Sequence, residues 1–327
     1  MSEAALTYRE AIKRGLVRAL KSDPRVFLMG EDVGKYGGAF AASKGLLDEF
    51  GPERIVDVPL SESGFTGAGI GAAIAGLKPI VEIMTVNFSL LALDQLVNNA
   101  ATLCHMSAGQ IYVPLVVRMG CGPGRQLAAQ HSHSWEPLFA MIPGLKVLAA
   151  GTHADAEEMI LMALQENNPV IILEYTSLLN TTEMFTAEKP NEIQRGAIRK
   201  IGSDITLITY GTGVFKSLQA AQELEKNGVS AEVLDLRVLR PIDTVSIITS
   251  AKKTRKILFI EDAWGTISMG AAVLSILYKE CFYELDQPIE HLSGLEVPTP
   301  YPLHLEAGCT PSVKDIVMRC NKILNHG

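Results

Sequence analysis

Hydrophobic and polar positions in the first half of the chain alternate between two patterns. Residues 5–21 repeat apolar side chains at the spacing of one helix face, and VFLMG at 26–30 is a short continuous apolar run, which is typical of a buried strand. The predicted strands are VFLMG, GPERIVDV, KPIVEIM, VPLVVRM, LKVLAA and PVIILEY, and the helices between them cover 40–50, 61–76, 89–106 and 153–167. This alternation predicts a parallel sheet covered by helices on both faces.

The alternation of strand and helix patterns ends after the last of these strands, where polar residues and a proline interrupt it. A second alternation then begins, with strands DITLITYGT, SAEVLDLR and KKTRKILFIEDA and helices VFKSLQAAQELEKNG and ISMGAAVLSILYKECF. We therefore predict an α/β fold of two domains, each a mostly parallel sheet covered by helices. The predicted boundaries are a first domain over 1–178, a linker over 179–197 and a smaller second domain over 198–327.

Charge and composition narrow the class of function. The 29 basic and 36 acidic residues give a net charge of −7, which disfavours nucleic acid or an anionic membrane as partner. No apolar run reaches the roughly 18 residues of a membrane helix. Five cysteines form no CxxC pair, which argues against a zinc cluster or a disulfide framework. We expect a bacterial cytoplasmic protein, or one of an organelle stroma or matrix if the chain is a processed form.

One carboxylate precedes a helix of very small residues, SESGFTGAGIGAAIAG at 61–76. Glu62 would lie in the first turn of this helix, where the helix dipole favours a negative charge. The glycines allow another surface to approach the helix backbone closely. Two interpretations stay open from the residues: a site that binds a ligand or partner, or tight helix packing with Glu62 solvated.

The same glycines suggest a rival of another class. The segment GAGIGA at 67–72 satisfies the permissive GxGxxA form of a dinucleotide-binding fingerprint, which would make the protein an NAD-linked oxidoreductase. That fingerprint places its glycines at the strand-to-helix turn, with an acid about 20 residues later. Here PLSESGFT separates the strand from the glycines, and the nearest acid, Glu82, comes early. The match is therefore weak.

Three segments follow predicted strands and so fall where parallel sheets bind ligands. They are GED at 30–32, SES at 61–63 and the loop 120–136, which carries His131 and His133 in QHSHS. A histidine that faces a cleft near a buried carboxylate acts as a general acid or base, whereas most loop histidines are hydrogen-bonded surface residues. We find no GxSxG elbow, no P-loop and no GDG-plus-Asn motif that would hold a diphosphate through magnesium.

Eight segments occur in this order along the chain: MGEDVG, PLSESGFTGAGIGAAIAGLKPIVEIMTVNFS, LDQLVNNAA, AAQHS, PGLKV, NNPVIILE, LRVLRPID and PTPYPLHLE. In this order they resemble the beta subunits of thiamine-diphosphate-dependent 2-oxo acid dehydrogenases, which are transketolase-like, and pyruvate-type members most closely. The resemblance covers essentially the whole chain. It implies a thiamine diphosphate pyrimidine-binding domain followed by a transketolase C-terminal-like domain.

The resemblance also implies roles for single residues. Glu62 matches the glutamate that hydrogen-bonds N1′ of the cofactor aminopyrimidine and so favours the tautomer that deprotonates the thiazolium. Phe88 matches the aromatic residue against the pyrimidine ring, with an ordinary core position as the alternative. His131 matches the histidine near the reacting carbonyl and the lipoyl group. Glu31 and Asp94 match acids that the family places toward the subunit interface, and Glu31 is also expected to be a cofactor-binding residue.

A structural potassium site and two protein partners complete what the resemblance implies. The potassium ligands are backbone carbonyl oxygens of Leu115, Ala163, Leu164, Glu166 and Asn168. Because this chain lacks the diphosphate motif, it resembles one half of an α2β2 enzyme whose alpha subunit brings Mg²⁺ and the diphosphate. The second domain is then the docking surface for the dihydrolipoyl acetyltransferase core.

We expect the assembled enzyme to decarboxylate pyruvate oxidatively and to acetylate a lipoyl group reductively, leading to acetyl-CoA. An acetoin or branched-chain 2-oxo acid enzyme stays open, because GCGPGRQLAAQHS departs from the usual pyruvate-type loop. A non-catalytic scaffold that keeps only the subunit interface is a further alternative.

Overall fold

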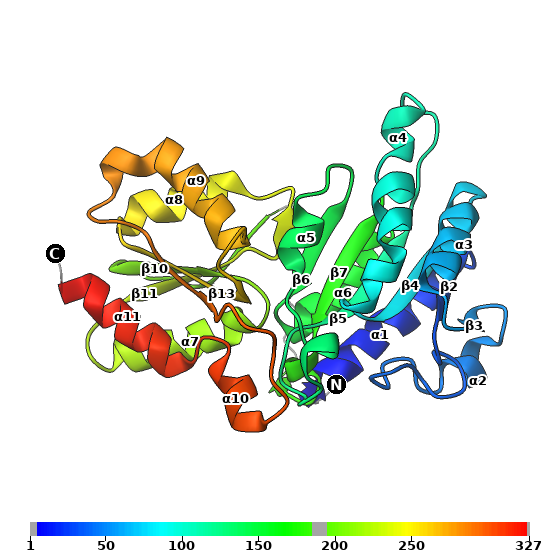
Figure 1. Cartoon of the computed structure of the whole chain (residues 1–327), viewed down its shortest axis with the longest axis horizontal. Helices are drawn as coiled ribbons and strands as arrows, with labels where there is room; N and C mark the ends of the chain where they lie inside the picture. Colours follow the sequence, from blue (N-terminus) through cyan, green and yellow to red (C-terminus); the bar gives the residue numbers. More distant parts are fainter. Residues whose placement is uncertain (1–4, 185–194, 326–327) are drawn as a thin grey trace. The chain divides into compact units, whose positions relative to one another are not determined.

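A computed structural model describes residues 5–184 and 195–325, which form two compact units (Figure 1). The first unit comprises residues 1–121 and 138–193, and the second comprises 122–137 and 194–327. The loop 122–137, which the sequence placed within the first domain, therefore groups with the second unit, because its contacts lie there. Most of the predicted linker, at 185–194, falls outside the described residues.

The sheet of the first unit is parallel, as its apolar runs predict. Its strand order is β6-β7-β5-β4-β2-β3. All residues of β5 and β7 are buried, which explains why these strands are apolar except for Arg118 and Glu174. The strands are β2 (Val26–Gly30), β3 (Ile55–Asp57), β4 (Lys78–Thr85), β5 (Val116–Cys121), β6 (Lys146–Ala150) and β7 (Val170–Tyr175).

Helices flank this sheet, and α1 packs against α6 while α3 packs against β4. The first predicted helix begins later than expected, because residues 5–7 form a strand that pairs antiparallel with 182–184. Thr7 and Glu10 then close a capping box at the start of α1. The elements are β1 (Ala5–Thr7), β8 (Thr182–Met184), α1 (Tyr8–Ser22), α2 (Leu46–Phe50), α3 (Glu62–Ile74), α5 (Glu136–Ala140), α6 (His153–Ala163) and η4 (Thr176–Leu178).

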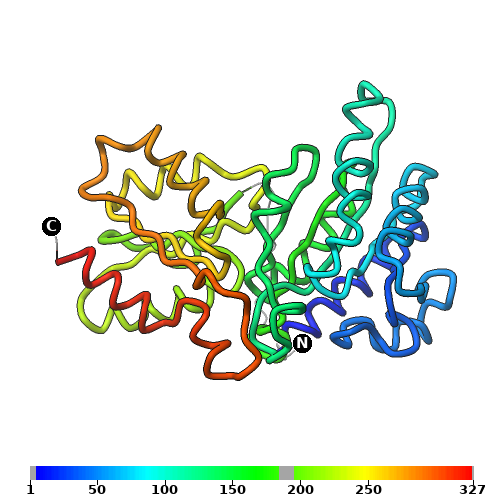
Figure 2. Tube along the Cα trace, in the orientation of Figure 1, coloured from blue at the N-terminus to red at the C-terminus, as the bar shows by residue number. Residues whose placement is uncertain are grey.

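The prediction of one regular helix over 89–106 is wrong. The segment is divided into η1 (Phe88–Ala92), a π-helical turn η2 (Gln95–Ala100) and α4 (Leu103–Met106), which together project from the sheet as one arm (Figure 2). The Thr102 hydroxyl donates to the carbonyl oxygen of Asn98 at 2.6 Å. Such side-chain bonds to the preceding turn bend helices, and π-helical turns are frequent at functional sites.

The second unit contains a mostly parallel sheet of order β14-β13-β10-β11-β9, in which, among the described residues, only the pairing of β9 with β11 is antiparallel. Its strands are β9 (Ala197–Lys200), β10 (Ile205–Thr209), β11 (Ala231–Asp235), β13 (Ile257–Trp264) and β14 (Glu290–Gly294), and β12 (Val238–Arg240) follows β11 in the chain. The helices are α7 (Thr212–Glu225), α8 (Thr244–Thr254), α9 (Met269–Cys281), η5 (Phe282–Glu284), α10 (Leu303–Gly308) and α11 (Val313–Asn325).

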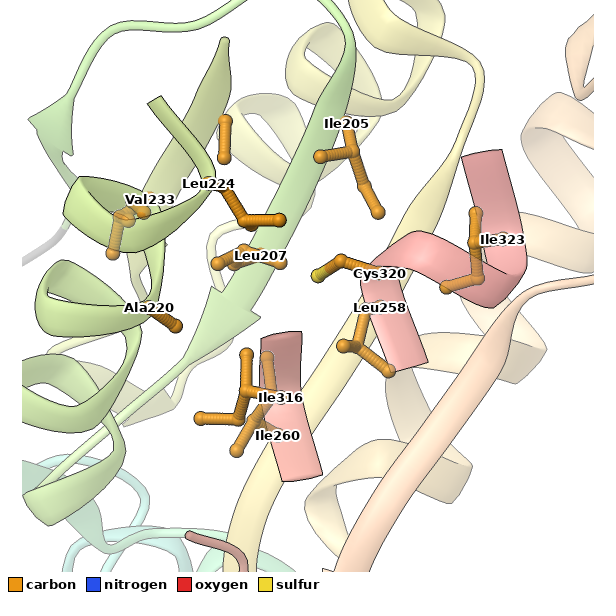
Figure 3. Close-up of a cluster of buried hydrophobic side chains, with 12 residues drawn as sticks. Ile205, Leu207, Ala220, Leu224, Val233, Leu258, Ile260, Ile316, Cys320 and Ile323 are labelled. Atoms are coloured by element: carbon orange, nitrogen blue, oxygen red, sulfur yellow. The ribbon is translucent and has the colours of Figure 1, made fainter. Parts of the chain in front are cut away.

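The core of the second unit forms where α7 and α11 cover this sheet (Figure 3). Strand residues Ile205, Leu207 and Leu258 meet Leu224 from α7 and Ile316 from α11. All five side chains are fully buried. The predicted fold class, two α/β domains with mostly parallel sheets, is thereby confirmed. Within the described part of the chain, no helix is long and apolar enough to cross a bilayer.

Candidate active site

Glu62 is the first residue of α3 and is only 6% exposed. The helix begins after β3, and Ser61 at its N-cap position makes no side-chain capping bond. The unsatisfied amides of a helix start and the helix dipole both favour a carboxylate at this place. The interpretation in which Glu62 is solvated is therefore wrong for the folded chain.

The glycines of α3 have two different environments. A Cβ atom on Gly69 would lie 2.8 Å from the Val81 side chain, so this glycine allows α3 to pack closely on β4. A Cβ atom on Gly71 would meet nothing within 4 Å. The GAGIGA segment thus lies inside the helix, with one glycine needed for packing and another on an open surface. It does not form the strand-to-helix turn that a dinucleotide fingerprint requires.

Glu31 follows the last residue of β2 and is 7% exposed. Neither of its carboxylate oxygens has a hydrogen-bond partner among the described residues. Burial raises the pKa of Glu31, and the charges of Glu62 and Asp32 raise it further. The structure therefore brings two buried carboxylates, Glu31 and Glu62, near each other. A buried carboxylate is stable only when a ligand or a water molecule donates a hydrogen bond to it, or when it binds a proton.

Phe88 completes this group of predicted residues in the first unit. It is half-buried and begins η1, shortly after β4 ends. Strands β3, β2 and β4 are neighbours in the sheet, so the segments that bear Glu62, Glu31 and Phe88 all leave the same edge, at the strand carboxyl ends. Asp94 lies further along the arm, where its carboxylate accepts the side-chain amide of Asn98 at 2.7 Å.

His131 belongs to the other unit. It is half-buried in a 3-10 turn, η3 (Ala129–His131), and its amide donates to the Ala128 carbonyl oxygen at 3.2 Å. The neighbouring His133 stacks on Trp135 with ring centroids 5.2 Å apart, and burial lowers the pKa of His133. In residues 5–184 and 195–325, no three His, Cys, Asp or Glu side chains gather as a metal site.

The predicted potassium ligands lie at the end of α6 and before β5. Three of these carbonyl oxygens already accept hydrogen bonds: Leu115 from Val170, Ala163 from Glu166, and Leu164 from the Lys78 ammonium at 3.1 Å. The Lys78 ammonium places a positive charge at one ligand of the predicted site. The donor set therefore fits a bound cation less well than free carbonyl oxygens would.

Sequence reasoning missed a buried ion cluster across three neighbouring strands. Arg118 in β5 lies between Glu82 in β4 and Glu174 in β7, and all three side chains are buried. The Arg118 Nε and Nη2 atoms donate to the two Glu174 oxygens at 2.9 and 2.6 Å, and Nη1 bonds to Glu82. The available signal was the presence of charged residues inside otherwise apolar strands.

Two family descriptions match the sequence. Residues 4–182 match "Transketolase, pyrimidine binding domain", and residues 194–316 match "Transketolase, C-terminal domain". A solved structure described as "Split gene transketolase, inactive beta4 tetramer" is similar at a TM-score of 0.80 over 98% of this chain and 99% of that chain, with 22% sequence identity. The fold is therefore that of a two-domain transketolase-type chain.

Closer relatives define the family. The pyruvate dehydrogenase E1 component subunit beta-2, mitochondrial, of Oryza sativa subsp. japonica is 42% identical over 95% of this chain and 84% of that protein. The pyruvate dehydrogenase E1 component subunit beta of Rickettsia felis is 40% identical over 97% of this chain and 98% of that protein. The chain belongs to the family of pyruvate dehydrogenase E1 component beta subunits. The resemblance seen in the sequence is confirmed.

Proposed function

We propose that this chain works with an alpha subunit, as an α2β2 heterotetramer, in the oxidative decarboxylation of pyruvate. The assembly acetylates the lipoyl group of dihydrolipoyl acetyltransferase, leading to acetyl-CoA, and the lipoyl disulfide is the electron acceptor. One observation carries the proposal: the buried carboxylates of Glu31 and Glu62 lie near each other in a domain of the pyrimidine-binding type.

The residues at this sheet edge fit the aminopyrimidine end of thiamine diphosphate. Glu62 would bind N1′, and the unpartnered oxygens of Glu31 would accept a hydrogen bond from the ligand or from water. Phe88 offers a half-buried aromatic side chain on the adjacent segment. Bound thiamine diphosphate supplies the electron sink that decarboxylation of a 2-oxo acid requires. We assign Mg²⁺ and the diphosphate to the alpha subunit, because this sequence has no GDG-plus-Asn motif.

Glu62 and Glu31 handle the proton at this end of the site. Burial and the nearby charge of Glu62 raise the pKa of Glu31, so Glu31 retains a proton more readily than a surface carboxylate does. Glu62 moves this proton at N1′, and Glu31 supports it from the end of β2. We place Asp94 toward the subunit interface, as the family resemblance implies.

Glu31→Gln is expected to raise the melting temperature of the cofactor-free protein near neutral pH. The pKa of Glu31 is raised above its ordinary value of 4.5, so its ionised form disfavours folding once the pH exceeds that value. The gain should therefore shrink as the pH falls and vanish near pH 4.5. Melting curves at several pH values test this, with the exposed Glu53→Gln as control. A variant no more stable than the parent protein near neutral pH would contradict it.

His131 is assigned to the reacting carbonyl and the incoming lipoyl group. Histidine side chains commonly serve as both donors and acceptors of protons near neutral pH. His131 is half-buried in a turn that follows a glycine-containing loop. His133 is not given this role, because its ring lies against two tryptophans and burial lowers its pKa.

Potassium and the acetyltransferase core are the remaining parts of the proposal. A structural K⁺ would use the carbonyl oxygens of Leu115, Ala163, Leu164, Glu166 and Asn168, and it would have to displace or accompany the Lys78 ammonium at Leu164. Docking of the dihydrolipoyl acetyltransferase core is assigned to the second unit. The exposed aromatic side chains of Tyr278, Phe282 and Tyr283 support this, because such residues are enriched in protein interfaces.

Steady-state rates of the reconstituted α2β2 enzyme test the substrate. We expect kcat/KM for pyruvate to exceed that for acetoin and for branched-chain 2-oxo acids by at least about 10-fold, since one extra methylene in a fitted pocket discriminates by this order. A preference for acetoin or for a branched-chain acid would overturn the substrate. Tight binding of NADH by the chain without its partner would instead support the oxidoreductase alternative.

A further inference from the structure

The loop 122–137 carries His131 but has a backbone that is unfavourable by itself. Gln126 and Ala128 adopt positive φ values of 55° and 60°. A residue with a Cβ atom loses free energy in this region, so the conformation persists only where contacts enforce it. The turn that bears His131 begins at the next residue, Ala129. Whatever holds Gln126 and Ala128 therefore sets where His131 lies.

A buried carboxylate on α10 binds the backbone amide of Gln126. Glu306 lies on α10 and is 2% exposed. Its two carboxylate oxygens accept a hydrogen bond from the backbone N–H of Gln126 at 3.0 and 3.1 Å. A carboxylate taken out of water requires strong hydrogen bonds, and a bond from an amide to an ionised acceptor is stronger than a neutral one. The Glu306 contact thus fixes the loop five residues before His131.

The segment after His131 is fixed from the same unit. The Thr299 hydroxyl donates to the Ser132 carbonyl oxygen at 3.4 Å, and the His133 ring lies 5.1 Å from Trp264 and 5.2 Å from Trp135, between centroids. A cavity of about 20 Å³ beside these residues leaves room for about one water molecule. The loop is therefore held on both sides of His131.

We infer that Glu306 is a positioning residue for His131. Its carboxylate holds Gln126 in the left-handed region and so starts the turn that presents the imidazole. The inference rests on the proposed function for the role of His131 alone. Glu306 and His131 belong to the second unit, whereas Glu62 belongs to the first. Loss of Glu306 should therefore impair the steps that use His131 and leave cofactor binding in place.

Fluorine NMR measures the loop position without using activity. The chain has two tryptophans: Trp135 stacks on His133, and the Trp264 ring contacts the same histidine at a tilted angle. We would label them as 5-fluorotryptophan and assemble the labelled chain with unlabelled alpha subunit. Glu306→Ala is expected to shift or broaden both resonances. The control is Asp204→Ala. Asp204 lies just before β10, and its carboxylate accepts a hydrogen bond from the Ser230 backbone amide at 2.7 Å. This control should leave both resonances unchanged.

A double-mutant cycle connects the loop position to the reaction. We expect Glu306→Ala to lower kcat for lipoyl acetylation by about 10- to 100-fold, the effect of misplacing a reacting group by about 1 Å, while thiamine diphosphate affinity changes by less than about 3-fold. The same substitution in a His131→Ala background should have little further effect. Glu306→Gln keeps one acceptor oxygen and should recover much of the activity.

The outcomes separate the inference from the proposed function. Unchanged fluorine resonances in Glu306→Ala would overturn the inference, as would an equal loss of activity with and without His131. If His131→Ala keeps full activity, the proposed role of His131 fails. Shifted fluorine resonances in Glu306→Ala would in that case still show that Glu306 fixes the loop position. This measurement does not depend on cofactor binding.

Discussion

Glu62→Gln is expected to reduce turnover of the reconstituted enzyme by about 10²- to 10⁴-fold, the usual worth of a positioned acid or base. The amide can still hydrogen-bond N1′, but it cannot hold and deliver a proton. The substitution keeps the size of the side chain and removes a charge from a buried place, so α2β2 assembly should be intact. The loss should therefore lie in chemistry and not in folding.

Turnover of pyruvate, sedimentation of the complex and thiamine diphosphate affinity should be measured together. Glu53→Gln serves as the matched control, because it is the same substitution at an exposed site in the same unit. Glu62→Asp keeps the acid on a shorter side chain and should retain more activity than Glu62→Gln. Full activity of Glu62→Gln would favour the scaffold alternative.

Arg118→Met is expected to destabilise the first unit by about 3–5 kcal/mol, the usual effect of removing one partner of a buried ion pair. The substitution leaves Glu82 and Glu174 buried without their cation. Burial already raises the pKa of Glu174, and the Arg118 charge opposes that shift. Without Arg118 the pKa of Glu174 rises further, so the deficit should shrink as the pH falls and the carboxylates become protonated.

Urea unfolding followed by circular dichroism near pH 7.5 and near pH 5.5 measures this effect. Arg25→Met is the control, because Arg25 forms an exposed pair with Asp23 and its loss should change stability far less. Equal stability changes for the two variants would contradict a structural role for the buried cluster. A deficit that grows at lower pH would contradict the assignment of the uncompensated charge to Glu174.

The sequence predicted the sheets because burial leaves a simple signature. Segments such as PVIILEY are apolar at nearly every position, Glu174 excepted, because both faces of the strand are covered, and β7 is fully buried. The place of Glu62 at a helix start followed from the small residues after it. Its burial and its nearness to Glu31 did not, because they depend on which strands are neighbours in the sheet.

Other features could not be read from local patterns. The apolar spacing over 89–106 suits a regular helix, and the division into η1, η2 and α4 comes from side-chain bonds and tertiary packing. The loop 122–137 lies in sequence between strands of the first unit, but its anchors, including Glu306, come from distant segments. Gln126 and Glu306 are 180 residues apart in sequence, and a contact over that separation produces no periodic pattern of hydrophobic residues.

The central claim is that Glu62 moves a proton on the bound cofactor, and hydrogen–deuterium exchange at thiazolium C2 tests it most directly. Exchange would be measured by NMR after acid quenching of the α2β2 enzyme loaded with thiamine diphosphate and Mg²⁺. Exchange in Glu62→Gln should be slower than in the parent enzyme by about 10²-fold or more, with the cofactor still bound. Equal exchange rates in the two proteins would contradict the account.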